Sequence, residues 1–269
     1  MLRKTRRDKA MVINALRTLA LLLVVTALAG CQFAGNNRGN VPLPKALVER
    51  MAAIGSSPAE PMMIRVYKES SELEVWKRTR GGQYALLKSY PICKWSGTLG
   101  PKVREGDYQS PEGFYDVTPF LLNPKSSYEL SFNVGFPNKF DSALSRTGSY
   151  LMIHGDCLSV GCYAMTDEGI REIYAMARET FKGGNSAFQL QLLPFRMTEA
   201  NLSTHAASPH AAFWRDLKVG TDAFDQTKQP PAWDVCEQRY VFNLNDPRTA
   251  PLDPNGACPV APFSTLAAL

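Results

Sequence analysis

The chain has 269 residues, enough for one sizeable domain with extensions, and its 45% hydrophobic and 20% charged residues are ordinary for a globular protein. Its net charge of +5 belongs entirely to residues 1–30, where six basic residues face the single acid Asp8. The rest of the chain balances to zero, so charge gives no support to a nucleic-acid-binding protein.

Residues 1–30 have the pattern of a secretory signal peptide: a basic start, an apolar run over 19–28 and two small residues before Cys31. The apolar run is too short for a membrane span. The sequence Leu28-Ala29-Gly30-Cys31 also resembles a bacterial lipobox, which implies that Cys31 is lipidated and becomes the mature N-terminus. Gln32 in place of an aspartate then implies the outer membrane. We therefore expect an exported, periplasmic lipoprotein that meets the membrane through its N-terminal lipid only; the alternative is an ordinary signal peptide with an incidental Cys31.

Residues 31–42 are polar and rich in Gly and Asn, which is typical of a flexible tether behind the lipidated cysteine. Within residues 43–61, Leu47, Met51 and Ile54 recur at helical spacing. This spacing predicts a short amphipathic helix over 44–54, followed by a linker.

From Met62 the apolar residues alternate with a period of two, which indicates a β-rich domain over residues 62–196. The expected strands are 64–68, 73–77 and 84–88, which form an antiparallel start, and then 114–117 and 128–134. Segments 95–102 and 105–113 are rich in Gly, Pro and Ser and are expected to be loops.

The stretch 149–165 brings together groups that can perform chemistry. Tyr150–Ile153 is β-prone and Gly155 ends it, so His154 is expected at a strand end. Gly161 permits a sharp turn that presents Cys162 and nearby backbone N–H groups to a developing oxyanion. An imidazole that accepts the thiol proton makes a cysteine nucleophilic. The pair predicts acyl transfer through a thioester.

The cysteine count supports a free thiol at this position. If Cys31 carries lipid, five cysteines remain, and an odd number in an oxidising compartment leaves one unpaired. Cys162 is the one with a chemical reason to be free. The other four allow three pairings; we favour Cys236–Cys258, which closes a loop of about twenty residues, with Cys93–Cys157 as the remaining pair.

The clearest helical pattern follows Cys162. Thr166 is a suitable N-cap, and an apolar stripe from Ile170 to Phe181 ends at Gly183; we interpret the stripe as core packing. Residues 188–195 alternate as a strand. Residues 197–269 form a C-terminal extension with a helix expected over 208–217 and a Pro-rich tail.

The run His154-Gly155 followed by Ser159-Val160-Gly161-Cys162 resembles the active-site signature of the YkuD-type L,D-transpeptidases, bacterial cell-wall enzymes with a catalytic cysteine. Segments 96–102, 110–115 and 146–148 are similar to the YafK-like branch, and the resemblance covers roughly residues 62–195. It implies an α+β fold. The catalytic domain would be β-rich, with mixed sheets in a sandwich-like arrangement and one main helix after the cysteine. A mainly helical or irregular C-terminal extension would follow.

The same resemblance implies that Cys162 is the nucleophile and His154 the general acid and base, with Ser159 and Gly161 forming the oxyanion turn. The substrate would be an L,D-peptide bond in a peptidoglycan stem peptide, cleaved without a metal or cofactor. Val160 replaces the histidine of most members, and Ala164 replaces an arginine that holds the substrate peptide. These departures leave cross-linking and hydrolysis open. The YafK-like branch is associated with detaching an outer-membrane lipoprotein from peptidoglycan, so a wall-linked lipoprotein is a candidate partner.

Further polar residues flank the motif. Arg146, Tyr150 and Tyr163 are candidates for contacts with a peptide carboxylate or a wall sugar, and Lys102 and Arg104 lie in a loop that can cover the cleft. A solvated surface role is an equal alternative for each.

Two other interpretations compete with the enzyme. His154, Cys157 and Cys162 have a spacing that structural zinc accepts. A non-enzymatic lipoprotein that binds the wall through the same groove is the second alternative. Asp156 is an unfavourable candidate for orienting His154, because Gly155 breaks the strand between them; a backbone carbonyl, as in the family, is the expected partner.

Overall fold

The computed structural model describes residues 38–244 and 250–259. The expected signal segment 1–30, the lipidation site Cys31 and most of the expected tether lie outside these residues. From Arg38 onward the described chain forms one compact unit. None of the described helices combines the length and the apolar composition needed to cross a membrane.

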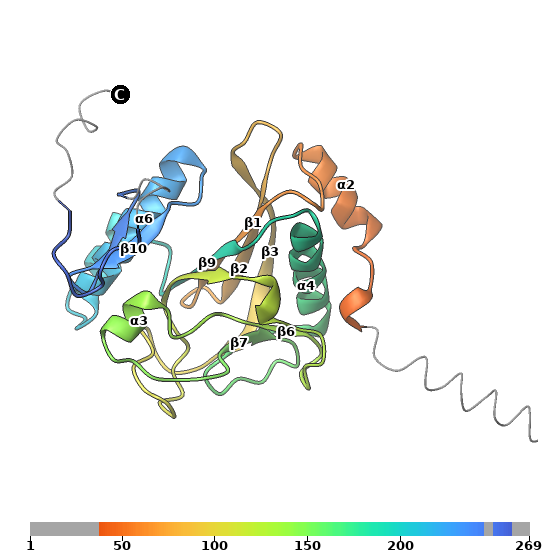
Figure 1. The fold of residues 1–269 in the computed structure, drawn as a ribbon. Helices are drawn as coiled ribbons and strands as arrows, with labels where there is room; N and C mark the ends of the chain where they lie inside the picture. Colours follow the sequence, from red (N-terminus) through yellow and green to blue (C-terminus); the bar gives the residue numbers. More distant parts are fainter. Residues whose placement is uncertain (1–37, 245–249, 260–269) are drawn as a thin grey trace, which may run out of the picture. The chain divides into compact units, whose positions relative to one another are not determined.

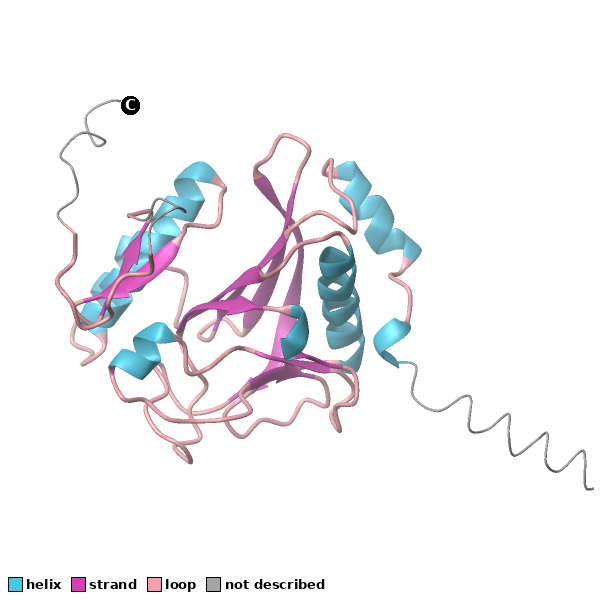
Figure 2. Cartoon of the chain, in the orientation of Figure 1, coloured by secondary structure: helices cyan, strands magenta, loops and turns pink. Residues whose placement is uncertain are grey.

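Helices and strands alternate irregularly along the chain (Figures 1 and 2). The helices are η1 (Arg38–Asn40), α2 (Lys45–Ala53), η2 (Pro119–Leu121), α3 (Lys139–Ala143), α4 (Asp167–Lys182), α5 (Glu199–Thr204) and α6 (Ala211–Thr227). The strands are β1 (Met62–Tyr67), β2 (Glu72–Arg78), β3 (Tyr84–Trp95), β4 (Gly113–Val117), β5 (Leu122–Asn123), β6 (Ser131–Asn133), β7 (Met152–His154), β8 (Tyr163–Met165), β9 (Phe188–Leu193), β10 (Trp233–Cys236) and β11 (Arg239–Phe242). The α+β class is confirmed.

Nine strands form one mixed sheet in the order β4-β9-β1-β2-β3-β8-β7-β6-β5. The strand β3 joins its two halves, because residues 84–91 pair with β2 while Ile92–Trp95 pair with β8. The antiparallel start β1-β2-β3 is confirmed. The expected sandwich-like arrangement therefore takes the form of a single sheet that curls at β3 (Figure 1).

Two cores lie on the two faces of this sheet. Helix α4 packs on one face, where Ile170 and Ile173 join Ile64, Val75 and other strand residues. Thr166 caps this helix as expected, because its side chain accepts a hydrogen bond from the Gly169 N–H. Figure 1 shows α4 on one side of the sheet and α6 on the other.

The second core explains why both faces of β9 are buried. Leu190 and Leu192 face the α4 side, whereas Gln189 and Gln191 face the C-terminal extension. The Gln189 amide donates to the Pro231 carbonyl at 2.8 Å, and Gln191 Oε1 accepts from Arg65 Nε at 2.7 Å. The alternation of β9 thus separates an apolar core from a buried polar layer.

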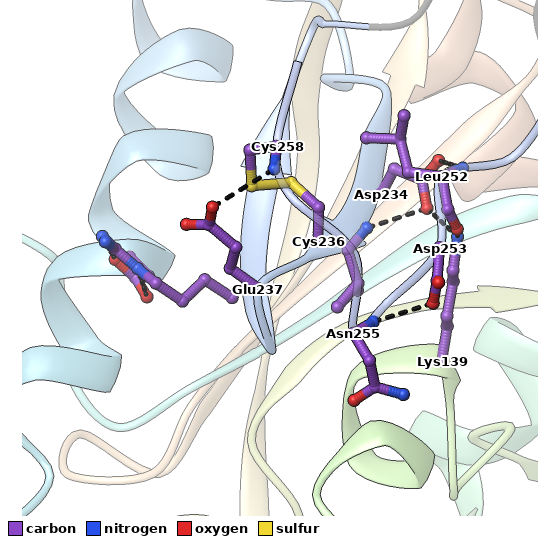
Figure 3. Close-up of a disulfide and its surroundings, with 11 residues drawn as sticks. Lys139, Asp234, Cys236, Glu237, Leu252, Asp253, Asn255 and Cys258 are labelled. Atoms are coloured by element: carbon purple, nitrogen blue, oxygen red, sulfur yellow. Dashed lines mark hydrogen bonds and ion pairs between the residues drawn. A yellow bond between two sulfur atoms is a disulfide. The ribbon is translucent and has the colours of Figure 1, made fainter. Parts of the chain in front are cut away.

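The C-terminal extension is more regular than its sequence indicates. Helix α6 runs ten residues past the expected end at Leu217, and the segment expected to be a Pro-rich tail contains the β10–β11 hairpin. Trp214 and Leu217 of α6 pack with Val235 of the hairpin in the second core. The disulfide Cys236–Cys258, the favoured pairing, closes this region (Figure 3).

Buried polar contacts hold the hairpin against α3. Asp234 forms an ion pair with Lys139, and its second oxygen accepts a hydrogen bond from the Leu252 N–H at 2.9 Å (Figure 3). Glu237 accepts from the Cys258 N–H at 3.3 Å. The extension is therefore fixed to the catalytic-domain segment 62–196 by both apolar and ionic contacts.

Candidate active site

The predicted nucleophile and base lie on neighbouring strands of the curled sheet. Strand β7 ends at His154 and pairs in parallel with β8, with His154 opposite Ala164. Extending this register back by one residue from Tyr163 places Cys162 beside Met152. Because alternate residues share a face, Met152, His154 and Cys162 point to the same side, and diagonal neighbours on adjacent strands lie roughly 7–8 Å apart.

This face opens into a cavity of about 240 Å³. The side chains that line it are Asn123, Ser126, Ser127, Tyr128, Ser131, Tyr150, Met152, His154 and Cys162. Among these described lining residues there is no Lys, Arg, Asp or Glu. The cavity therefore presents hydroxyl, amide and aromatic groups around one thiol and one imidazole.

Cys162 is half-buried and free, whereas the four other cysteines in the described part of the chain are paired. Its sulfur accepts a hydrogen bond from the Met152 N–H at 3.4 Å and lies 3.7 Å from the Tyr150 carbonyl, to which the thiol donates. Burial raises the pKa of the Cys162 thiol, opposed by the Met152 N–H and the positive charge of Lys102. The resting sulfur is thus a protonated thiol at neutral pH.

His154 is only 4% exposed, and its Nδ1 is 2.6 Å from the Gly155 carbonyl. With the proton on Nδ1 donated to that carbonyl, Nε2 is left as the basic atom. Burial lowers the pKa of His154, opposed by the Gly155 hydrogen bond and the negative charge of Asp156. The ring also lies 5.0 Å from the Tyr128 ring. A backbone carbonyl, not the exposed Asp156 side chain, orients the imidazole.

The two pKa shifts point the same way. Burial disfavours the charged form of both groups, so the pair rests as neutral imidazole and thiol. A preformed thiolate–imidazolium pair would need the opposite shifts.

Three serines contact the backbone of Cys162 directly or through one another, and two of them, Ser96 and Ser110, begin segments that resemble the YafK-like branch but were given no role from the sequence. The Ser110 and Ser159 hydroxyls both donate to the Cys162 carbonyl, at 2.9 and 2.6 Å. Ser96 Oγ lies 2.9 Å from Ser159 Oγ, and the Ser96 N–H donates to Ser110 Oγ. Ser159 therefore acts on the turn, as expected, while Ser96 and Ser110 are brought to it by loops more than fifty residues away in sequence. The resemblance of segments 96–102 and 110–115 to the YafK-like branch was the signal that could have identified them.

A buried ion pair lies behind this serine cluster. Lys68 and Glu112 are both fully buried with their charged atoms 2.9 Å apart. Lys68 also donates to the Ser110 carbonyl at 2.7 Å, and Glu112 accepts from Trp214 Nε1 at 2.9 Å. The pair thus links the residue that follows β1 to the loop that carries Ser110 and to helix α6.

Gly161 is the glycine that the turn requires. Its φ is +111°, in the region that favours glycine, while an added Cβ would find its nearest neighbour, Leu151 Cδ2, at 3.8 Å. Backbone conformation, not space, therefore selects glycine immediately before Cys162.

The disulfide Cys93–Cys157, the expected remaining pair, ties the loop between His154 and Cys162 to strand β3. This bond overturns the zinc alternative, because Cys157 no longer offers a thiolate to a metal. Within the described residues, moreover, there is no cluster of three His, Cys, Asp or Glu side chains placed to hold an ion.

Of the flanking candidates, only Tyr150 lines the cavity. Arg146 instead forms an ion pair with Asp141 at 2.9 Å, and the Tyr163 hydroxyl is buried and donates to the Pro111 carbonyl at 2.7 Å. These contacts give no support to substrate-binding roles for Arg146 and Tyr163.

The loop expected to cover the cleft does approach the site. Lys102 is buried and its ammonium pairs with Asp107 and donates to the Arg104 carbonyl. The Thr147 N–H donates to the Val103 carbonyl, which joins this loop to the segment that leads into β7. Lys102 thus acts on Cys162 through its charge and not as a solvated side chain.

Comparison with known proteins identifies a relative that is similar over most of the chain. No family model matches the chain. The chain is similar to the protein named "Putative L,D-transpeptidase YafK" of Escherichia coli K12, with 43% identity over 231 residues that cover 85% of this chain and 91% of the relative. The protein of the same name in strain O157:H7 matches equally well. Among solved structures, the helical cell shape determining protein Pgp2 (K307A mutant) of Campylobacter jejuni is 18% identical with a TM-score of 0.42, covering 68% of this chain and 66% of its own. That likeness is too weak to carry a functional conclusion, but an identity of 43% over nearly the whole relative is decisive. The chain belongs to the YafK-type family of L,D-transpeptidase homologues.

Proposed function

We propose that this protein is a cell-wall enzyme that cleaves an L,D-peptide bond in peptidoglycan stem peptides by cysteine acyl transfer. The observation that carries the proposal is the free thiol of Cys162 on the same cavity face as the buried imidazole of His154. The relationship to the YafK-type proteins supports the wall as the substrate.

In the proposed reaction, His154 Nε2 takes the Cys162 proton as the sulfur attacks the carbonyl carbon of the L-centre of a diamino acid. Backbone N–H groups near Gly161 and Cys162 hold the oxyanion. When the tetrahedral intermediate collapses, the C–N bond breaks and His154 returns the proton to the leaving amine. The thioester that remains is resolved by a second amine, which gives transfer, or by water, which gives hydrolysis.

The lining of the cavity favours one class of amine component. The described lining residues include no lysine or arginine, and Arg146 forms an ion pair with Asp141. An amine with a carboxylate on the adjacent carbon would have no cation to meet in this cavity. A lysine side chain of a wall-linked lipoprotein carries no such carboxylate, so we propose hydrolytic release of a lipoprotein as the first reaction to test.

The expected location fits this proposal. Lipidation of Cys31 would hold the enzyme in the periplasm at the outer membrane, beside the wall. Mass spectrometry of the mature N-terminal peptide tests whether Cys31 is lipidated. An unmodified N-terminus downstream of residue 31 would contradict lipidation.

The decisive experiment is incubation of the mature protein with two defined muropeptides, followed by mass spectrometry. One carries a lysine side chain on the L-centre of the diamino acid, and the other carries a terminal D-amino acid there. Released amine and shortened peptide indicate hydrolysis, whereas dimers or exchanged residues indicate transfer. Cys162→Ala should abolish both, while Cys162→Ala cells with unchanged wall composition and retained wall binding would favour the non-enzymatic alternative.

A further inference from the structure

Ser131 is the direct cross-strand neighbour of His154. In the antiparallel pair β6–β7, Ser131 is in register with His154, and in the pair β5–β6, Asn123 is in register with Ser131. All three side chains line the cavity. They therefore form one row across three strands, on the face that carries Cys162.

The Ser131 hydroxyl is available to form a hydrogen bond with a ligand. Ser131 is only 2% exposed, and the described part of the chain gives its side chain no hydrogen-bond partner. Neighbouring polar groups differ, since Ser126 Oγ accepts from the Tyr128 N–H and Asn123 Oδ1 accepts from the Lys125 N–H. Unlike Trp233 Nε1, the Ser131 oxygen is not sealed from solvent. Because Ser131 lines the cavity, its hydroxyl is free to bond a ligand there.

The order of groups across the sheet indicates which part of a substrate would reach it. Moving from β8 to β5, the same face presents Cys162, which lies two residues before the β8 partner of His154, and then the row His154, Ser131 and Asn123. Neighbouring strands are about 4.8 Å apart. Because His154 returns its proton to the leaving amine, the amine must lie beside His154, and the chain attached to it continues over Ser131.

We propose that Ser131 is a substrate-binding residue whose hydroxyl donates a hydrogen bond to the peptide on the amine side of the scissile bond. The inference rests on the proposed function, since the amine side is defined by Cys162 and His154. The same position would serve the leaving amine during acylation and an incoming amine during transfer.

The test compares Ser131→Ala and Ser131→Thr with the matched control Ser89→Ala, an exposed strand serine on β3. The substrate is the muropeptide that carries a lysine side chain on the L-centre. Ser131→Ala should lower kcat/KM by about 2- to 13-fold, the loss of one hydrogen bond between uncharged groups. Ser131→Thr, which keeps the hydroxyl, should recover most of it, and Ser89→Ala should match the wild type.

Two further readouts separate substrate binding from a structural role. The rate at which iodoacetamide alkylates Cys162, and its pH profile, should be the same in Ser131→Ala as in the wild type. The Tm should stay close to that of the wild type, because Ser131→Ala breaks no hydrogen bond of the side chain within the described part of the chain. An unchanged kcat/KM, or a fall in alkylation equal to the fall in kcat/KM, would overturn the inference.

Protection of Cys162 from iodoacetamide by the muropeptide is measured in parallel, since it reports binding without turnover. A wild-type protein that is protected but forms no product contradicts the proposed function alone. Ser131 is then judged by protection: weaker protection in Ser131→Ala supports its role, and equal protection refutes it. If the wild-type protein forms no product and is not protected by the muropeptide, both proposals are contradicted.

Discussion

Removing the Cys93–Cys157 disulfide should cost both stability and the geometry of the candidate site. The bond joins residues 64 apart, so on the loop-entropy model its loss lowers the free energy of unfolding by about 4 kcal/mol. Cys236–Cys258 joins residues 22 apart and is worth about 3 kcal/mol on the same model. The double variants Cys93→Ser/Cys157→Ser and Cys236→Ser/Cys258→Ser are therefore close in stability cost but differ in position.

The position should decide the effect on Cys162. Cys157 lies in the loop between the imidazole and the thiol, whereas Cys236 lies in the C-terminal hairpin. At a temperature where circular dichroism shows both double variants folded, the first should lose product formation and the second should keep it.

Urea unfolding measures the stabilities, and muropeptide turnover per folded molecule measures the site. Equal turnover in the two double variants would refute the idea that the disulfide positions the catalytic loop. An unchanged free energy of unfolding in the first would refute the loop-entropy magnitude.

Four further outcomes follow from the structure. Alkylation of Cys162 by iodoacetamide should rise with pH, with its midpoint above the ordinary range of a thiol pKa, because burial raises the pKa of Cys162; a plateau between pH 5 and 8 would indicate an ion pair instead. Since burial lowers the pKa of His154, the midpoint of the acid limb of the pH–activity profile should lie below pH 6.5. Gly161→Ala should cost about 1–3 kcal/mol in urea unfolding, from its φ of +111° and not from a clash. Lys68→Met should cost about 3–5 kcal/mol, because Glu112 is left buried without a partner, and Glu112→Gln in the same chain should recover part of that loss.

The serine cluster holds the turn around Cys162 rigid. A carbonyl that accepts two hydroxyl hydrogen bonds cannot rotate without breaking both, and Ser110 is itself held by the buried Lys68. The peptide group that follows Cys162 is thus fixed from two loops before any substrate arrives. Such preorganisation is what stabilisation of a developing oxyanion requires.

The sequence predicted the elements that depend on local chemistry. The helix after the catalytic stretch begins at the expected cap because Thr166 satisfies the Gly169 N–H and its apolar stripe has helical spacing. The placement of His154 at a strand end also follows from a nearby glycine. The cysteine count left one thiol unpaired, and chemistry selected Cys162. Three pairings of the other four stayed open, of which the structure has the favoured one, Cys236–Cys258 with Cys93–Cys157.

The tertiary structure alone decided how distant segments meet. The burial of Gln189 and the length of α6 depend on the extension packing against the sheet, and no local periodicity reports that contact. Ser110 reaches the Cys162 carbonyl, and Ser131 reaches the row of His154, only because the sheet brings its strands into register. Short-range patterns in a chain show which face of an element is apolar. Which other segment packs against that element depends on contacts between residues far apart in sequence, which these patterns do not report.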